Sequence, residues 1–264
     1  DLSPPATAHR PWTVPSSPWV LSMRWASLTF LHWPVPVAAL RPLIPNELEV
    51  DTYAGEAWIG VVPYRMEQTK VRGLPLVPGT HTFGEFSVRT YVRHAPTGRA
   101  GVWFFSLDAA SFLAVWAARA SFGLPYFTAE ISVAHDVAVM KGSQLTDPAV
   151  AESAVVRYFS RRTHRGAPEA AFRATVLPMN SLVSAEPSSL THWFTERYAL
   201  FAKRFGKLVT GDIHHRPWPL RPAEARIEAN TLVSAWGIDL PDVAPYAHYA
   251  EAVDVVAWPP RVVG

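Results

Sequence analysis

Two segments, EFSVRTYVR at residues 85–93 and GVWFFSLD at residues 101–108, indicate how the chain folds. Both are rich in β-branched and aromatic residues, and the Pro-Thr-Gly at residues 96–98 between them is typical of a turn. They therefore predict a β-hairpin. Residues 103–105, Trp-Phe-Phe, are apolar on both faces of the second strand, which places that strand in the middle of the structure.

Side chains of the first hairpin strand alternate between two faces. The apolar face carries Phe86, Val88, Thr90 and Val92, and the polar face carries Glu85, Ser87, Arg89, Tyr91 and Arg93. The polar face either is solvated above an apolar core or lines the interior of a barrel. In the second arrangement Glu85 would be an acid or base beside arginines. Periodicity does not separate these two arrangements.

A helix is predicted directly after the hairpin, over residues 111–122, and Gly123 and Pro125 end it. It is apolar all round, with Arg119 as its only charge, and this pattern is typical of a buried helix. Arg119 either complements the negative end of the helix or clamps a ligand carboxylate.

Most of the remaining segments are predicted to be strands, so the predicted class is α+β with a predominance of β. Residues 1–18 contain five prolines and predict an extended arm, and residues 19–264 predict a single domain. Strands are expected at residues 21–32, 48–53, 57–65, 126–135, 154–163, 171–177, 207–215, 225–230 and 247–258, and helices at residues 37–43 and 190–203.

Composition excludes several classes of protein. Hydrophobic residues make up 49% of the 264 residues and charged residues 17%, which is enough for a large core. No apolar run is long enough to span a bilayer and no secretory signal is recognisable, so no membrane partner is expected. The absence of cysteine fits a cytoplasmic location. A net charge of +2, with the arginines of residues 157–165 taken as a solvated surface, predicts no nucleic-acid partner.

The first predicted strand carries polar groups at its two ends. Strict alternation places on one face Ser22, Arg24, Ala26, Leu28, Phe30 and His32. Arg24 and His32 would then flank an apolar patch, as two polar anchors on a cavity wall. The alternative is that both reach solvent at the strand ends.

The pair His214-His215 suggests a metal, but adjacent strand residues point to opposite faces. A site with three ligands would need His32 or another distant residue, so no metal and no other cofactor is expected. Trp218, one of eleven tryptophans, either packs the core or gives a pocket its aromatic lining.

Several long segments, in one order, resemble the bacterial YqjF-like proteins, a family of unknown function. The resemblance covers nearly the whole chain and is carried by MRW at residues 23–25, HWPV at 32–35, ALRPLIP at 39–45, LEVD at 48–51, GVWFFSLD at 101–108, FGLPY at 122–126, TERY at 195–198, IHH at 213–215 and PWPL at 217–220.

That family is similar in turn to acetoacetate decarboxylase, which implies a cone-shaped antiparallel β-barrel with a few flanking helices around an enclosed site. The resemblance matches Glu85 and Arg119 to a glutamate and an arginine of the decarboxylases. Arg24 falls near the arginine that meets the substrate carboxylate. Tyr126 stands where the decarboxylases have their Schiff-base lysine, and Phe127 takes the place of the neighbouring lysine.

A phenol cannot form an iminium, so the chain is predicted not to be a Schiff-base decarboxylase. Lysine occurs only at positions 70, 141, 203 and 207. The leading hypothesis is an enzyme that acts on a small organic acid or carbonyl compound, as a lyase, isomerase or cyclase. Tyr126 and Glu85 would exchange protons, and Arg24 or Arg119 would hold an anionic group. The remaining predicted ligand contacts are His32, Arg89, His214 and Trp218.

Two alternatives remain open at this point. One is a non-catalytic protein that binds a small ligand in the same barrel. The other is a metal or haem site that involves His32 and His214. Apolar edge strands and tryptophans also leave room for a homodimer.

Overall fold

The computed structural model describes residues 7–75, 79–138 and 153–263, and the mainly β class is confirmed. The strands are β1 (Leu21–Val35), β2 (Leu48–Val50), β3 (Ala57–Val71), β4 (Phe83–His94), β5 (Arg99–Ala109), β6 (Tyr126–Ala138), β7 (Ser153–Arg162), β8 (Ala171–Pro178), β9 (Ala199–Arg204), β10 (Lys207–His215), β11 (Leu220–Asn230), β12 (Tyr246–Ala257) and β13 (Arg261–Val262). The helices are α1 (Val37–Leu40), α2 (Phe112–Phe122) and α3 (Leu190–Thr195), with 3₁₀ turns at Arg41–Leu43, Ala95–Thr97 and Ser234–Trp236.

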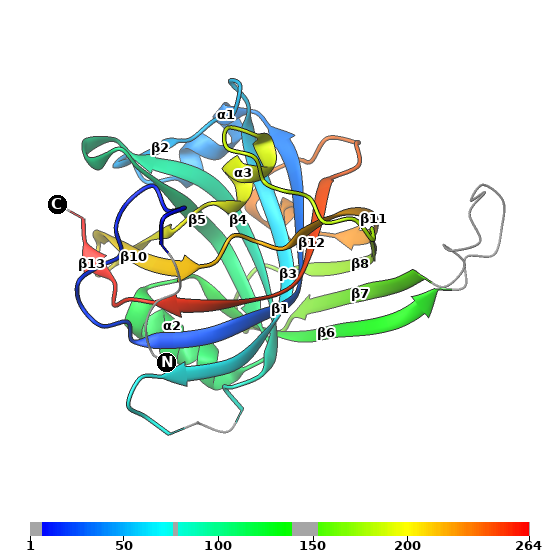
Figure 1. Ribbon diagram of the computed structural model, residues 1–264, viewed down its shortest axis with the longest axis horizontal. Coiled ribbons are helices and arrows are strands. Elements are labelled where there is room, and N and C mark those ends of the chain that lie inside the picture. Colours follow the sequence, from blue (N-terminus) through cyan, green and yellow to red (C-terminus); the bar gives the residue numbers. More distant parts are fainter. Residues whose placement is uncertain (1–6, 76–78, 139–152, 264) are drawn as a thin grey trace.

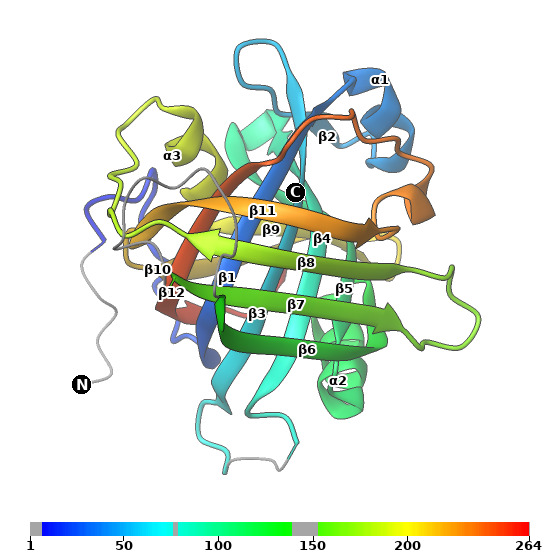
Figure 2. The ribbon, with the colours of Figure 1, turned by 90° about the vertical axis from the view of Figure 1, so that its right-hand side faces the viewer.

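The described strands form one large sheet that curls into a ring. Hydrogen-bonded neighbours run from β5 through β4, β3, β1, β12, β10 and β9 and return to β5. A second layer of β6, β7, β8 and β11 continues from this ring and crosses over it (Figures 1 and 2). The described strands thus form a sheet that curls around an interior space.

Pairing is antiparallel throughout the described sheet except at β5, where the expectation of an antiparallel barrel is too simple. β5 runs parallel to β6 and to β9. Parallel neighbours cannot be joined by a tight turn, and α2 supplies the crossover from β5 to β6. This crossover places Tyr126, the first residue of β6, beside Leu107 of β5.

Strand β4 is covered on both faces, so the interpretation of its polar face as solvated is wrong. On the apolar face, the ring of Phe86 packs edge-on against Tyr158 of β7 and Phe172 of β8, with centroids 6.0 and 5.8 Å apart. On the other face, Glu85 and Ser87 are each only 1% exposed. The second layer thus buries one face of β4, and the ring encloses the other (Figure 2).

Two predictions about helices are wrong. Helix α2 lies on the outside of the ring (Figure 1), and Phe112, Leu113 and Trp116 are 71%, 48% and 66% exposed. The second predicted helix ends at Thr195 instead of continuing to residue 203, because the following residues join the sheet as β9. No helix within the described ranges is long and apolar enough to cross a membrane.

The part of the proline-rich arm that the structure describes, from residue 7, packs along β10 without regular structure. Arg10 is buried and donates a hydrogen bond of 2.6 Å to the carbonyl of Ile213. The indole of Trp12 donates to Asp212 at 3.2 Å. These contacts fix the described part of the arm against the ring.

Candidate active site

The ring encloses a cavity of about 780 Å³ whose walls are mostly apolar. Its lining includes Leu28, Phe30, Val62, Met66, Phe104 and Leu107. Among the large apolar residues of the lining, Leu74 after β3 and Trp116 of α2 are the most exposed, at 62% and 66%. These two segments therefore mark the mouth of the cavity.

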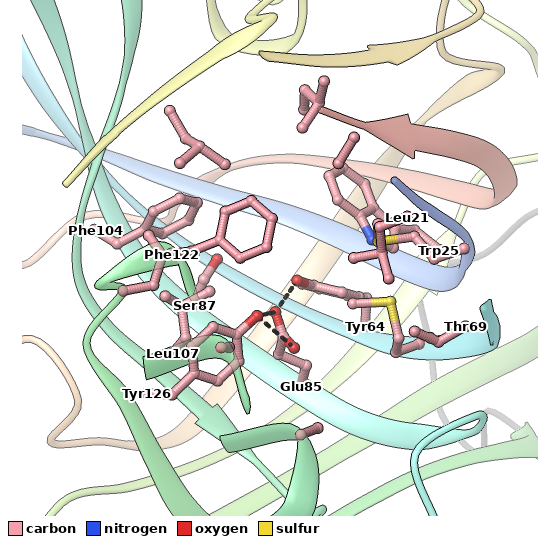
Figure 3. Close-up of a pocket in the computed structure, with 18 of the residues that line it drawn as sticks. Leu21, Trp25, Tyr64, Thr69, Glu85, Ser87, Phe104, Leu107, Phe122 and Tyr126 are labelled. Carbon is pink, nitrogen blue, oxygen red and sulfur yellow. Dashed lines mark hydrogen bonds between the residues drawn. The ribbon is translucent and has the colours of Figure 1, made fainter. Parts of the chain in front are cut away.

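A buried carboxyl group and two phenols meet on the cavity wall (Figure 3). Glu85 of β4 lies directly opposite Tyr64 of β3 in the antiparallel register. The hydroxyl of Tyr64 donates a hydrogen bond to Glu85 Oε1. The hydroxyl of Tyr126 lies 3.1 Å from both carboxyl oxygens of Glu85. We call Tyr64, Glu85 and Tyr126 the Tyr–Glu–Tyr cluster.

The environment of this cluster shifts the protonation of all three groups. Burial raises the pKa of Glu85 from 4.5 to about 7, and the hydrogen bonds from Tyr64 and Tyr126 act in the opposite direction. Burial and the nearby Glu85 charge raise the pKa of both tyrosines well above 10. At neutral pH both phenols are therefore donors, and Glu85 can either give or take a proton.

Arg89 lines the cavity on the same face of β4 as Glu85 and Ser87. It is half-buried, and its guanidinium carbon lies 5.3 Å from the ring centroid of Phe30 and 5.9 Å from that of Tyr91. The structure thus places Arg89, a predicted ligand contact, on the cavity wall.

Trp218 also lines the cavity, in agreement with its predicted place in an aromatic lining. Its ring stacks on Trp25 at 6.0 Å and meets Phe30 edge-on at 5.0 Å. The indole N–H donates to the carbonyl of Thr195 at 3.1 Å, which fixes the ring in place.

Arg24 lies outside the cavity, half-exposed and paired with Asp254 at 3.2 Å. The cause is a local irregularity of β1. Ser27 has a φ of 49°, and the register with β3 shifts between Ala26 and Leu31. This bulge reverses the alternation of side chains, so that the cavity receives Met23, Trp25, Leu28 and Phe30 instead of Arg24. The predicted shared face of Arg24 and Phe30 is wrong.

The predicted histidines point into the protein core and not into the cavity. His32 shares a hydrogen bond of 2.6 Å with the hydroxyl of Tyr91 and stacks on Phe194 at 3.7 Å. His214 lies beside Arg10 at 3.3 Å. Its neighbour His215 lines the cavity instead, because adjacent strand residues face opposite sides. Within the described residues no group of three His, Asp or Glu side chains could hold a metal ion.

Arg119 is exposed on α2 and does not belong to the described cavity lining. Its guanidinium donates to the backbone carbonyl of Tyr126 at 2.8 Å. Arg119 lies in the last turn of α2, as its predicted role at the negative end of the helix requires, and it also supports the first residue of β6.

Among the polar residues that line the cavity, the predicted site residues do not include Tyr64, Arg197 and His215. Tyr64 lies in a strand that was predicted, but only the register shows that it faces Glu85. Arg197 fell within the overextended helix prediction. His215 was considered, but periodicity did not show which of two adjacent histidines faces inward. Burial lowers the pKa of His215 to about 3, so its ring is neutral.

Comparison with known proteins gives one family match and one close relative. The model of the DUF2071 family, described as an uncharacterized conserved protein, matches residues 22–254. The protein YqjF of Bacillus subtilis (strain 168) is 42% identical over 249 residues, covering 94% of this chain and 95% of YqjF.

Two similar solved structures share the fold at low sequence identity. The enduracididine biosynthesis enzyme MppR complexed with pyruvate has a TM-score of 0.60 at 16% identity and covers 97% of this chain and 93% of its own. An acetoacetate decarboxylase-like enzyme from Sphingomonas wittichii RW1 has a TM-score of 0.60 at 15% identity, covering 98% of this chain and 100% of its own.

Proposed function

Because the chain belongs to the DUF2071 family and has the acetoacetate decarboxylase-like fold, we propose a function from the chemistry of its cavity. The protein is an enzyme that moves a proton to or from a carbon atom next to a carbonyl group, without a covalent lysine intermediate. The observation that carries this proposal is the Tyr–Glu–Tyr cluster, a carboxyl group with a pKa near 7 held by two phenols in an apolar cavity.

Each member of the cluster has a role in this proposal. The Glu85 carboxylate removes the proton from the carbon, and the electrons of the C–H bond move onto the carbonyl oxygen. The hydroxyl of Tyr126, or that of Tyr64, turns from Glu85 to donate a hydrogen bond to this oxygen. Protonated Glu85 then returns the proton to the same or another carbon atom. Isomerisation, cyclisation and the loss of a leaving group can all follow from such an enolate.

Deuterium exchange tests this role whatever product the enzyme forms. The protein is incubated in D₂O with a panel of carbonyl compounds, and deuterium at the carbon next to the carbonyl is measured by mass spectrometry. We expect exchange by the wild-type protein and a fall to the buffer rate in Glu85→Gln. Tyr53→Phe, which removes a phenol that bonds to the carbonyl of Ser188 outside the cavity, is the matched control and should exchange normally.

The outcome separates this proposal from its alternative, a non-catalytic binding protein on the same fold. Binding of a carbonyl compound with no exchange above the buffer rate would contradict the enzyme and favour the binding protein. The mostly apolar lining is the observation that favours this alternative. A cytoplasmic location and a homodimer stay predictions from the sequence.

Covalent lysine catalysis is tested separately by borohydride reduction in the presence of a β-keto acid. No lysine within the described residues lines the cavity, and Lys141 lies outside those residues. We expect no adduct on the intact protein by mass spectrometry. A stable adduct on Lys70, Lys141, Lys203 or Lys207 would show that an amine, and not the Tyr–Glu–Tyr cluster, performs the chemistry.

A further inference from the structure

The cavity lining contains two guanidinium groups, and their charges are balanced differently. Arg197 is buried and forms an ion pair of 2.7 Å with Asp51. Within the described residues Arg89 forms no ion pair, and its buried Nε has no hydrogen-bond partner. A cation in an apolar enclosure costs free energy when no anion lies nearby. Of the two arginines, Arg89 is therefore the one that an anionic ligand would stabilise.

Arg89 also has a defined position relative to the Tyr–Glu–Tyr cluster. Glu85 and Arg89 are four residues apart on one face of β4, so their backbones are separated by about 13 Å. Burial raises the pKa of Glu85 against the hydrogen bonds from Tyr64 and Tyr126, and Arg89 is not among the causes of the shift. Arg89 can therefore pair with a ligand while Glu85 acts elsewhere on the same molecule.

The remaining surface of the cavity is apolar from Arg89 to the mouth. Phe104 and Trp25 line the interior, and Leu74, Leu113 and Trp116 continue the apolar surface to the outside. A volume of about 780 Å³ is within the range of pockets for ligands much larger than a keto acid of three or four carbons. A small polar acid would leave most of this surface without contacts.

We propose that the ligand is an amphipathic carboxylic acid, with its carboxylate on Arg89 and its apolar body along the lining toward α2. This ligand would occupy the same cavity as the substrate, so its role as a substrate rests on the proposed function. The guanidinium fork suits a carboxylate, with two parallel N–H···O bonds. The carbon chain would pass Glu85, which places a carbon atom within reach of the acid–base group.

Direct binding of simple probes tests this ligand class. Dodecanoate, butanoate and dodecanol are titrated below the micelle concentration of dodecanoate and the solubility limit of dodecanol, and quenching of tryptophan fluorescence is followed, since Trp25 and Trp218 line the cavity. We expect dodecanoate to bind at least ten-fold more tightly than either other probe, because only dodecanoate has both the charge and the apolar chain.

Variants assign the effect to Arg89. Arg89→Gln should lose roughly ten- to hundred-fold in dodecanoate affinity and keep its dodecanol affinity, since charged hydrogen bonds differ from neutral ones by this amount. Arg24→Gln, which removes an exposed arginine outside the cavity, is the matched control and should bind as the wild type does. Equal affinity of Arg89→Gln and wild type for dodecanoate would overturn the proposal, as would tighter binding of butanoate by the wild type.

The proposed enzyme activity and the proposed ligand class can be contradicted independently of each other. Glu85→Gln should bind dodecanoate like the wild type, because binding depends on Arg89 and the apolar lining. If exchange is absent but dodecanoate binding depends on Arg89, the ligand class stands and the enzyme proposal falls. If exchange occurs but dodecanoate does not bind, the ligand class falls and the acid–base centre stands.

Discussion

The Glu85→Gln variant is expected to gain stability over the wild type as the pH rises. The difference in free energy of unfolding, variant minus wild type, should be about 3 kcal/mol larger at pH 8 than at pH 4. The reason is the pKa of Glu85, which burial raises from 4.5 in a solvated chain to about 7 in the folded protein. Glutamine fills the same space and never carries a charge. The measurement is urea denaturation of both proteins across this pH range.

The sign of the effect follows from where each state binds the proton. Below pH 4.5 Glu85 is protonated in both states and contributes no pH dependence. Between pH 4.5 and 7 the unfolded chain loses the proton and the folded protein keeps it, so wild-type stability falls as the pH rises. Above pH 7 the difference is constant. Other titrating groups cancel, because they are present in both proteins.

Glu224→Gln is the matched control, since Glu224 is an exposed glutamate on β11. The pH dependence of Glu85→Gln is compared with that of this surface variant. A flat difference between Glu85→Gln and wild type would mean that the carboxyl group of Glu85 ionises as easily inside the cavity as in water. The acid–base role of Glu85 would then lose its physical basis.

The second large effect is expected at the buried ion pair of Asp108 and Arg162. Asp108 accepts hydrogen bonds from Arg162 Nη2 at 2.8 Å and from Nε at 3.0 Å, and both side chains are almost completely buried. Asp108→Asn leaves the guanidinium charge without a counter-charge and should cost about 3–5 kcal/mol of unfolding free energy. Chemical denaturation at one fixed pH measures this loss.

The neighbouring residue on β7 provides the control. Arg161 pairs with Glu130 at 2.8 Å, but both side chains are more than half exposed. Glu130→Gln should cost less than about 1 kcal/mol. The double variant Asp108→Leu with Arg162→Met should recover most of the stability. Similar costs at Asp108 and Glu130 would contradict the assignment of a buried pair.

This ion pair also bears on the active site and corrects the prediction of a solvated arginine surface. Arg162 lies 4.3 Å from the ring of Phe127, the residue after Tyr126. The ion pair and Arg119 therefore both hold the beginning of β6. Of the arginines taken as a solvated surface, Arg162 is buried, and Arg157 and Arg161 are exposed.

The sequence predicted those parts of the fold that depend on local pattern. The hairpin at residues 85–108 forms as expected, with Gly98 at a φ of 64° in its turn. Gly123, with a φ of 69°, ends α2 as expected. The resemblance to the decarboxylases predicted that Glu85 and Tyr126 share one site, and the structure places their oxygens 3.1 Å apart.

The parts that could not be predicted depend on register and on long-range packing. A single left-handed residue, Ser27, reverses the alternation of β1, and no local pattern reveals it. Tyr64 meets Glu85 only through the pairing of β3 with β4. The apolar composition of α2 suggested burial, but Leu113 and Trp116 instead form the mouth of an apolar cavity.

The protonation of Glu85 can be observed directly. In protein labelled with ¹³C at the glutamate carboxyl carbon, the Glu85 signal is assigned by its absence from Glu85→Gln and followed by NMR from pH 4 to pH 9. We expect a midpoint near pH 7, as burial among Tyr64, Tyr126 and the apolar lining requires. A midpoint near 4.5, the value of a solvated glutamate, would contradict it.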